Sequence, residues 1–515
     1  MRPAGLTLFC LAMLFSHLSQ ASRALAPLTR RWMALPKAIA AGPISDTIFA
    51  LSSGSSLQKT GVAVVRISGP HAFPVLAQLL PGNSSSLPPP RKASLRKLFC
   101  PDSGDMLDQA LVLCFPSPSS FTGEDVVELH CHGSRAVITG LFSAFDKVNQ
   151  ILFEERWRGM LRPAERGEFT QRAFENGKMD LTEVEGLADL LEAETSLQRK
   201  QALQQMEGHL RVKFEAWRQE LVHCLAHTEA VIDFGDDERE SDIDDSTMYS
   251  LVPRVKELRD ELAQYLNDGR RGELVREGLR IALVGRPNAG KSSLLNLLAK
   301  RPAAIVSPIA GTTRDVIEVR MDLDGIPCII SDTAGLRLGE DSAVDVIEME
   351  GIRRAREAFK AAHIKVFVHD SSDTDSTHSP YDLLRSILLG SGEDTNPEMH
   401  DYDESERYRV IMVFNKIDIK DNSTKQNELD ERIKTCSISC VTGEGILKFE
   451  ETLLSEATWL LNSSRMQGED NTLITRERHR RHMKNCVSHL DMFLLERLPM
   501  DAAAEELRYV CNWIF

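Results

Sequence analysis

A glycine-rich loop at residues 285–293 constrains this chain more than any other stretch of its sequence. The loop reads Gly-Arg-Pro-Asn-Ala-Gly-Lys-Ser-Ser and fits the pattern G-x-x-x-x-G-K-S. An apolar run of strand type, Leu279–Val284, comes before it, and a helical run, Leu294–Leu298, comes after it. Such a strand–loop–helix unit turns backbone N–H groups and a helix N-terminus towards a polyphosphate. The sequence therefore predicts a nucleotide-binding domain built on a sheet.

The side chains of the loop predict how the phosphates are bound. Lys291 would reach the β- and γ-phosphates, and the Ser292 hydroxyl would be a ligand of Mg²⁺. The neighbouring residues complete the predicted nucleotide contacts of the loop: Asn288, Ala289, Gly290 and Ser293.

Two later motifs predict further ligands for Mg²⁺ and the γ-phosphate. Gly311–Asp315 contains Thr312 and Thr313, and we expect the Thr313 hydroxyl to be a second Mg²⁺ ligand. Asp332 directly follows an apolar strand, where its carboxylate can hold Mg²⁺ through water. The rest of that motif can approach the γ-phosphate: Thr333, Ala334 and Gly335.

The last two motifs predict that the base is guanine. Asn415, Lys416 and Asp418 follow another strand, and the Asp418 carboxylate can accept hydrogen bonds from the N1–H and amine of guanine. Ser439 and Cys440 follow the final strand and would support the base. Because adenine has a lone pair in place of N1–H, the motif selects GTP over ATP.

The residue that orients the attacking water in many small GTPases is missing from its usual place. Gly335 is followed by Leu336, which has no polar group, where a glutamine often stands. We therefore expect another residue or a partner to position the water, and the stretch Glu340–Glu350 is the candidate. The alternative for that stretch is a flexible acidic loop.

Composition describes a multidomain globular chain with no overall affinity for a polyanion. With 515 residues, about three domains are expected. The net charge of −15 means that any RNA contact must use a local basic patch. The ten cysteines have neither C-x-x-C pairs nor zinc spacing, which favours reduced thiols.

Residues 1–45 are expected to be a targeting segment. They contain five basic residues and no acid, a composition typical of a mitochondrial transit peptide. A secretory signal is the alternative, because Arg2 is followed by an apolar run up to Phe15. That run is too short to cross a bilayer, and we expect no membrane span. A GTP-binding domain favours the mitochondrial interpretation, with the matrix as location.

Hydrophobic patterning divides the rest into four parts. Residues 46–165 mix strands with helices and are expected to form an α+β domain. Residues 166–272 and 455–515 have apolar residues at helical spacing, so they predict one helical domain. Residues 273–454 alternate strands and helices, which indicates a doubly wound, mostly parallel sheet inserted in the helical domain. The predicted strands are Asp46–Leu51, Val62–Ile67, Ala110–Phe115, Arg280–Val284, Val316–Leu323, Pro327–Ser331, Ile364–Val368, Val410–Phe414 and Thr435–Ser439.

Three local features carry smaller expectations. The acidic stretch Asp236–Asp245 reads as a solvated loop before a helix at Val252–Leu266, and residues 370–406 read as an exposed insertion. His130 and His132 share one face of a strand. Metal binding would need a third ligand, and none lies nearby, so polar contacts are the preferred interpretation.

Segments outside the nucleotide motifs resemble the MnmE (TrmE) family of tRNA modification GTPases in its mitochondrial form. They are Val65–Pro70, Ser120–Gly133, Gly167–Phe174 and Asn176–Leu181, and the resemblance covers about residues 46–508. It implies a potassium-dependent GTPase that modifies C5 of the wobble uridine of mitochondrial tRNAs, to a taurinomethyl or carboxymethylaminomethyl type. A non-catalytic, GTP-dependent assembly or RNA-chaperone factor is the alternative.

The resemblance also implies partners and sites. The one-carbon donor would be a tetrahydrofolate derivative (5,10-methylene- or 5-formyl-), in contact with Arg66, Glu128 and Lys178. An FAD-dependent, MnmG-like subunit would be the protein partner, and the chain would form a homodimer through its N-terminal domain. Glu348 would position the attacking water. K⁺ would be bound by Asn288, Ser307, Ile309 and Thr312.

Two departures from the family pattern stand out. Residues 149–160 look like an extra piece before Arg162. The family ends in a Cys-x-Gly-Lys tail that reaches towards the folate, whereas this sequence ends Tyr-Val-Cys-Asn-Trp-Ile-Phe, and the family cysteine is not carried over to Cys511.

Overall fold

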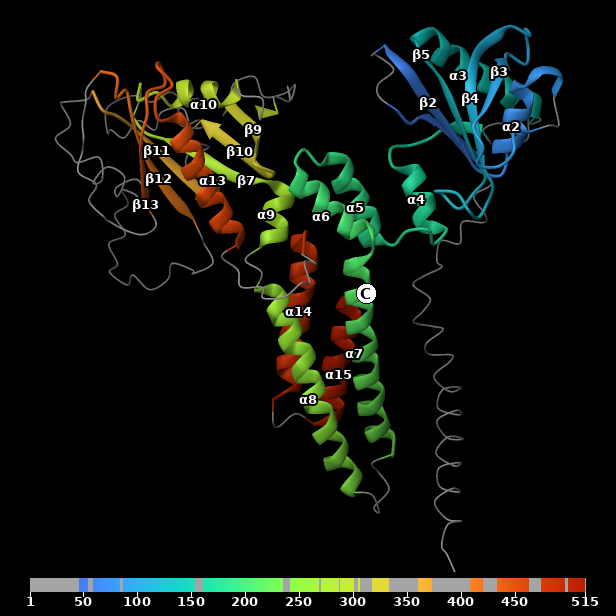
Figure 1. Cartoon of the computed structure of the whole chain (residues 1–515). Coiled ribbons are helices and arrows are strands. Elements are labelled where there is room, and N and C mark those ends of the chain that lie inside the picture. Colours follow the sequence, from blue (N-terminus) through green and yellow to red (C-terminus); the bar gives the residue numbers. More distant parts are fainter. Residues whose placement is uncertain are drawn as a thin grey trace, which may run out of the picture. The chain divides into compact units, whose positions relative to one another are not determined.

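A computed structural model gives two compact units, which divide between Met179 and Asp180 (Figure 1). Each unit is described by itself. The structure describes residues 46–53, 59–83, 87–152, 161–234, 241–267, 270–286, 288–300, 304–305, 317–332, 360–372, 408–419, 433–462, 474–495 and 499–514.

The N-terminal unit is built on a six-stranded sheet of order β3-β4-β5-β2-β1-β6. Its neighbours run antiparallel except for the pair β1 and β6, which is parallel. The strands alternate buried and less buried residues, as expected where one face of a sheet packs on a core. Their bounds are β1 Thr47–Leu51, β2 Thr60–Ser68, β3 Ser94–Phe99, β4 Met106–Phe115, β5 Val126–Gly133 and β6 Leu161–Pro163.

Two helices cover one face of this sheet through a single apolar core. They are α2 (Ala72–Leu79) and α3 (Arg135–Leu152), and Figure 1 shows both beside the sheet. The fully buried side chains of Phe145 and Leu141 on α3 pack with those of Val65 and Ile67 on β2. The first part of the predicted extra piece, residues 149–152, therefore continues α3, and residues 153–160 lie outside the described part.

The unit also includes α4 (Glu168–Glu175), beyond the expected domain end at residue 165. The reason is electrostatic. The Arg172 guanidinium is 1% exposed and contacts the carboxylates of Asp46, Glu124 and Glu168 at 3.0–3.1 Å. Asp46 directly precedes β1, Glu124 lies just before β5, and Glu168 is on α4 itself. Since a buried cation requires such partners, α4 belongs with the N-terminal sheet.

The second unit contains a four-helix bundle. Helices α7 (His209–Phe234), α8 (Ser241–Leu266), α14 (Glu477–Phe493) and α15 (Met500–Ile514) lie side by side (Figure 1) and share one core. The bundle joins residues predicted as the two halves of a helical domain. None of the described helices is both long and apolar enough to cross a bilayer.

One expectation about the bundle is wrong. Residues 241–245, the end of the acidic stretch expected to be a loop, form the first turn and a half of α8. Asp and Glu are favourable near a helix N-terminus, where the helix dipole is positive. Residues 235–240 lie outside the described part.

A helical pair connects the bundle to a second sheet. It consists of α5 (Leu181–Glu192) and α6 (Ser196–Met206), and each helix begins with a capping box, formed by Asp180 with Glu183 and by Thr195 with Gln198. A short helix, α9 (Arg271–Glu277), leads from the bundle into the first strand of the sheet.

The second sheet has seven strands in the order β13-β12-β11-β7-β10-β9-β8. Four neighbouring pairs are parallel, and only the pairs that involve β9 are antiparallel. This confirms the predicted mostly parallel sheet and its six strands. The bounds are β7 Leu279–Val284, β8 Ala304–Ile305, β9 Ile317–Leu323, β10 Ile326–Asp332, β11 Ile364–Asp370, β12 Arg409–Asn415 and β13 Ile433–Ser437.

Helices α10 (Lys291–Ala299) and α13 (Ile446–Asn462) pack on this sheet. The expected domain boundary at residues 454 and 455 falls inside α13. Ala457, Leu460 and Leu461 lie in the same core as the strands, so the helix stays with the sheet beyond that boundary.

Candidate functional site

The glycine-rich loop leaves β7 where the carboxyl ends of the parallel strands meet. Gly285, Asn288 and Gly290 all have positive φ. A Cβ at Gly285 would lie 2.1 Å from the Val368 carbonyl oxygen, and one at Gly290 would lie 2.0 Å from Asn415 Nδ2. Both positions therefore require glycine, because the loop passes too close to the neighbouring strands for a side chain.

Lys291 begins α10 and folds back over the loop. Its side chain is buried, and its Nζ donates hydrogen bonds to the carbonyls of Gly285 at 3.0 Å and Arg286 at 2.9 Å. Burial lowers the pKa of Lys291, and the nearby Asp332 carboxylate opposes that effect. The ammonium group is thus held inside the loop, where the phosphates of a nucleotide are predicted to bind.

Ser292 and Asp332, both predicted to bind magnesium, lie in direct contact. The Ser292 hydroxyl donates to Asp332 Oδ2. Asp332 is 6% exposed, and its Oδ1 is buried with no hydrogen-bond partner among the described residues. A buried carboxylate oxygen without a donor is costly unless a cation or water satisfies it. Hydroxyl and carboxylate oxygens are also the ligands that Mg²⁺ prefers, so these residues fit the ion.

Asn415 ties the phosphate loop to the loop after β13. It is 2% exposed; its Nδ2 donates to the Ala289 carbonyl at 2.8 Å, and its Oδ1 accepts from the Cys440 N–H at 3.2 Å. The buried Ser439 hydroxyl accepts the N–H groups of the next turn, Val441 and Thr442. These bonds hold the predicted phosphate and base loops in one arrangement.

The remaining base residues lie at the same edge of the sheet. Lys416 has positive φ and pairs with Asp370 at the end of β11. Asp418 is exposed and close enough to the Cys440 thiol to raise its pKa, although burial is the larger cause. An exposed carboxylate beside this loop is available to a ligand. Asp370 is a contact that sequence reasoning missed, because no pattern singled out the end of β11.

Several predicted residues lie outside the described part of the chain. They are Ser307, Ile309, Thr312, Thr313, Thr333, Ala334, Gly335 and Glu348. The exposed Ser293 lies on α10 directly after Ser292. Residues 373–406 of the predicted insertion also lie outside.

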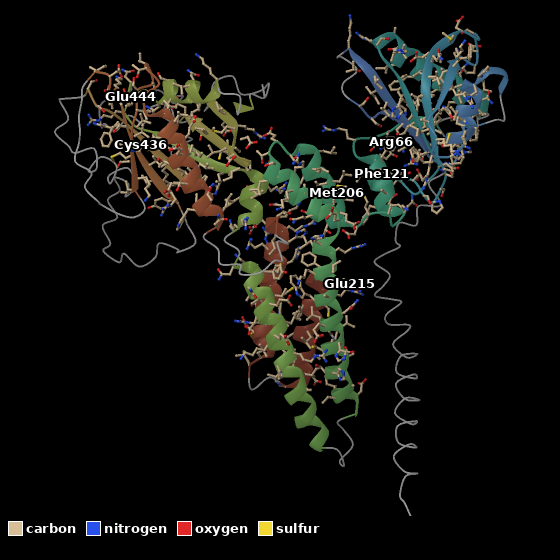
Figure 2. All side chains as sticks on the ribbon, in the orientation of Figure 1. Arg66, Phe121, Met206, Glu215, Cys436 and Glu444 are labelled. Carbon is tan, nitrogen blue, oxygen red and sulfur yellow. The ribbon has the colours of Figure 1, made fainter. Side chains whose placement is uncertain are left out.

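The N-terminal unit brings Arg66 and Glu128 together. They are direct cross-strand neighbours on β2 and β5, and Arg66 Nε donates to Glu128 Oε1 at 3.0 Å. The Arg66 guanidinium also lies 5.5 Å from the ring centre of Phe121 and 5.6 Å from that of Phe169 (Figure 2). The result is an ion pair between two aromatic rings. Sequence reasoning did not assign a role to either ring, although both lie in segments that carry the family resemblance.

The third predicted folate residue, Lys178, follows α4 and contacts the loop that carries Phe121. Its Nζ donates to the Pro118 carbonyl at 2.9 Å, and the nearby Asn176 donates to the Thr122 carbonyl at 2.8 Å. The structure gives Lys178 no direct contact with Arg66 or Glu128.

The two histidines of β5 have acidic neighbours. His132 Nδ1 is 2.7 Å from Asp108 Oδ1, and His130 Nε2 is 3.5 Å from Glu128 Oε2. Asp108 has a lowered pKa because hydrogen bonds from His132 and Gln109 outweigh its burial. No group of three metal-ligating side chains occurs among the described residues.

Two family models match the chain. The MnmE helical domain matches residues 181–514, and the N-terminus of GTP-binding protein TrmE matches residues 47–178. Together they cover both units of the structure.

Similar proteins match over nearly their whole length. The mitochondrial tRNA modification GTPase gtpbp3 of Dictyostelium discoideum is 42% identical, covering 90% of each chain. The human mitochondrial 5-taurinomethyluridine-[tRNA] synthase subunit GTPB3 is 42% identical, over 90% of this chain and 87% of that one. The tRNA modification GTPase MnmE of Parvibaculum lavamentivorans is 41% identical, over 90% of this chain and 93% of that one.

Among solved structures, the G domain of the T. maritima FeoB iron transporter covers 35% of this chain and 98% of its own at 25% identity. Its TM-score of 0.24 carries no argument about function. The family assignment rests instead on the full-length relatives and both domain models, which agree with the nucleotide loop described above. The chain belongs to the MnmE family of tRNA modification GTPases.

Proposed function

We propose that this chain hydrolyses GTP and takes part in modifying C5 of the wobble uridine of mitochondrial tRNAs. Family membership supports this, as do the names of the animal relatives, which are mitochondrial 5-taurinomethyluridine-[tRNA] synthase subunits. The observation that carries it is the cluster of Lys291, Ser292 and Asp332, with a buried carboxylate oxygen left without a donor.

The chain's own residues would bind and orient the nucleotide. Lys291 would exchange its two carbonyl contacts for phosphate oxygens, and Ser292 and Asp332 would hold Mg²⁺. When bound, the ion offsets the negative charge that develops on the phosphate oxygens. Asp418 would read the guanine edge, while Asn415 keeps the phosphate and base loops together. Thr313 and Gly335 would complete the ligands from segments beyond the described residues.

Hydrolysis would use K⁺ and Glu348. Asn288, at positive φ in the loop, would be one potassium ligand, with Ser307, Ile309 and Thr312 from the following segment. A cation beside the phosphates would stabilise the same charge as an arginine finger does. Glu348 would orient the water, since Leu336 has no polar group.

A reduced folate would bind in the N-terminal unit. The Glu128 carboxylate can accept N–H groups of a pterin, and the rings of Phe121 and Phe169 offer aromatic faces. His130 Nε2 is buried beside Glu128 without a hydrogen-bond partner among the described residues, so the site has unmet polar capacity that suits such a ligand.

Lys178 would contact the folate from the segment that follows α4. We further propose an FAD-dependent MnmG-like partner, a homodimer through the N-terminal domain, and a location in the mitochondrial matrix after removal of residues 1–45. We propose the domain limits predicted from the sequence, with two changes. The boundary at residue 165 moves beyond α4, and the boundary at residue 454 moves beyond α13.

The test is mass spectrometry of wobble uridines in mitochondrial tRNA after depletion of the protein. We expect the modified uridine to disappear on depletion and to return with the parent chain. It should not return with Lys291→Ala. The matched control is Lys300→Ala, an exposed lysine at the end of the same helix. Unchanged wobble uridines after depletion would contradict the proposal.

The same experiment separates the alternative. A non-catalytic assembly or RNA-chaperone factor needs GTP binding but not hydrolysis. Restoration of the modified uridine by Glu348→Ala, in a form shown to bind GTP without hydrolysing it, would favour that alternative.

A further inference from the structure

The hairpin of β9 and β10 runs from the nucleotide site to the helical part of its own unit. At one end, β10 finishes at Asp332, which bonds Ser292 of the phosphate loop. Thr313 precedes β9 and Gly335 follows β10 in the sequence, so both strands lead directly into predicted phosphate and magnesium ligands. The pairing is unbroken from Asp332 opposite Ile317 to Ile326 opposite Leu323. A strand of this length spans about 23 Å at roughly 3.3 Å per residue.

The turn at the other end of the hairpin is seated on the first turn of α6. The Gly325 carbonyl accepts the Leu197 N–H at 3.4 Å. A Cβ at Gly325 would lie 2.7 Å from Ser196 Oγ. Asp324 and Gly325 both have positive φ, and Asp322 Oδ1 accepts the Gly325 N–H at 2.5 Å. The turn therefore has a defined shape and lies against α6, where an added side chain would first meet the Ser196 hydroxyl.

Helix α6 is hydrogen-bonded in turn to other segments of the helical part. Gln198 donates to the Arg276 carbonyl at 3.1 Å, at the end of α9. Gln205, at the other end of α6, donates to the Thr182 carbonyl of α5 and accepts the Thr475 hydroxyl just before α14. A shift of α6 would therefore displace groups at the start of a bundle helix.

The junction is only partly apolar. Leu197 of α6 packs against the core of the sheet, and polar groups lie beside that contact. A cavity of about 480 Å³ lies beside it, and Glu194, Gln198, Arg276 and Arg320 are among its lining residues. The ion pair of Arg320 with Glu194 is half-exposed and long, at 3.5 Å, so it adds little to stability. The polar part of this interface resists relative movement less than the apolar packing of Leu197 does.

We propose that the contact between the β9–β10 turn and α6 tells the helical bundle which nucleotide, GTP or GDP, is bound beside Asp332 at the other end of the hairpin. Gly325 and Ser196 are the positioning residues of this contact. The inference rests on the proposed use of GTP by this chain. Nothing in the contact touches the nucleotide, so its loss removes no nucleotide contact and uncouples α6 from the nucleotide.

The experiment compares hydrogen exchange of α6 amides with GDP and with a non-hydrolysable GTP analogue bound. Gly325→Asn adds a side chain at the seat, and asparagine tolerates the left-handed conformation. Ser196→Leu fills the same contact from α6 and leaves the turn intact. Gly104→Asn is the matched control, because Gly104 also has positive φ but has open space around it.

In the parent and in Gly104→Asn, we expect α6 exchange to differ between the two nucleotide states. In Gly325→Asn and Ser196→Leu, we expect that difference to be lost while both variants still bind GTP. If the parent binds GTP but its α6 amides exchange equally with either nucleotide, the inference is overturned while the proposed function stands. The same holds if both Gly325→Asn and Ser196→Leu keep the full difference in α6 exchange between the two nucleotides. A parent that binds no GTP would overturn the proposed function and the inference together.

Discussion

Asn415 offers the sharpest test of how the nucleotide loops are held together. Asn415→Ala removes two hydrogen bonds, to the Ala289 carbonyl at 2.8 Å and from the Cys440 N–H at 3.2 Å. Each bond is worth about 1 kcal/mol, and a buried group left without its partner costs about 1–3 kcal/mol. Because Asn415 is 2% exposed, water cannot easily replace the lost contacts. We therefore expect the free energy needed to open the sheet around the nucleotide loops to fall by about 2–4 kcal/mol.

Native-state hydrogen exchange of the amides of β7 and β12 measures that loss locally, without assuming that the whole chain unfolds in one step. Exchange through opening of the sheet should be about 30-fold to 700-fold faster in Asn415→Ala. Asn415→Asp should be similarly affected at neutral pH, because it keeps the acceptor for Cys440 but places an oxygen against the Ala289 carbonyl.

The matched control is Asn296→Ala, an exposed asparagine on α10. It should change the free energy of opening by no more than about 0.5 kcal/mol, because surface substitutions away from special features are close to neutral. If Asn415→Ala also stays within that range, Asn415 does not tie the two loops together.

Four further predictions concern the nucleotide site and acid stability. Asp418→Asn should weaken GTP binding by about 1–3 kcal/mol, and unchanged affinity in a direct titration would remove Asp418 as the base reader. GTP turnover should be faster in KCl than in NaCl at equal ionic strength, and Glu348→Ala should slow it by about 10²-fold or more with GTP affinity retained. Equal rates in both salts would contradict the potassium site, and normal turnover by Glu348→Ala would contradict the role of that residue. Burial acts to raise the pKa of Glu168, but hydrogen bonds from Arg162, Arg172 and the Glu165 N–H outweigh it and lower the pKa from 4.5 to about 2. The N-terminal unit should therefore lose stability as the pH falls from 4.5 towards 2, because a carboxylate with a depressed pKa must be protonated. Exchange of β1 amides should show less acid sensitivity in Glu168→Gln, and an unaltered profile would refute the assignment.

The predictions that the structure confirms depend on local pattern. Loop 285–293 is recognisable because its glycines, lysine and serines act within one strand–loop–helix unit, and Lys291 and Ser292 lie where that unit requires. Four of the six predicted strands, β7, β10, β11 and β12, are recognisable because a strand buried on both faces reads as a short apolar run. Strand β9 instead alternates apolar and charged residues. The Ser292–Asp332 contact follows from parallel topology, which brings the carboxyl ends of the strands to one edge.

The spacing of apolar residues in the sequence predicted least well where a helix changes its surroundings along its length. Helix α13 continues past residue 454 because Ala457 and Leu460 still face the sheet, and helical spacing cannot say which core a helix joins. The acidic residues 241–245 are helical at a terminus where the helix dipole favours them, although their composition indicated a loop.

Long-range contacts between charged and aromatic groups were decided only by the tertiary structure. Arg172 is a residue type that is normally exposed, and it is buried because Asp46 and Glu124 reach it from distant segments of the chain. Phe121 and Phe169 flank Arg66, and Gly325 lies against Ser196, for the same reason. Spacing in a sequence reports the neighbours within one element, whereas these contacts join residues tens to more than a hundred positions apart, which only the folded chain brings together.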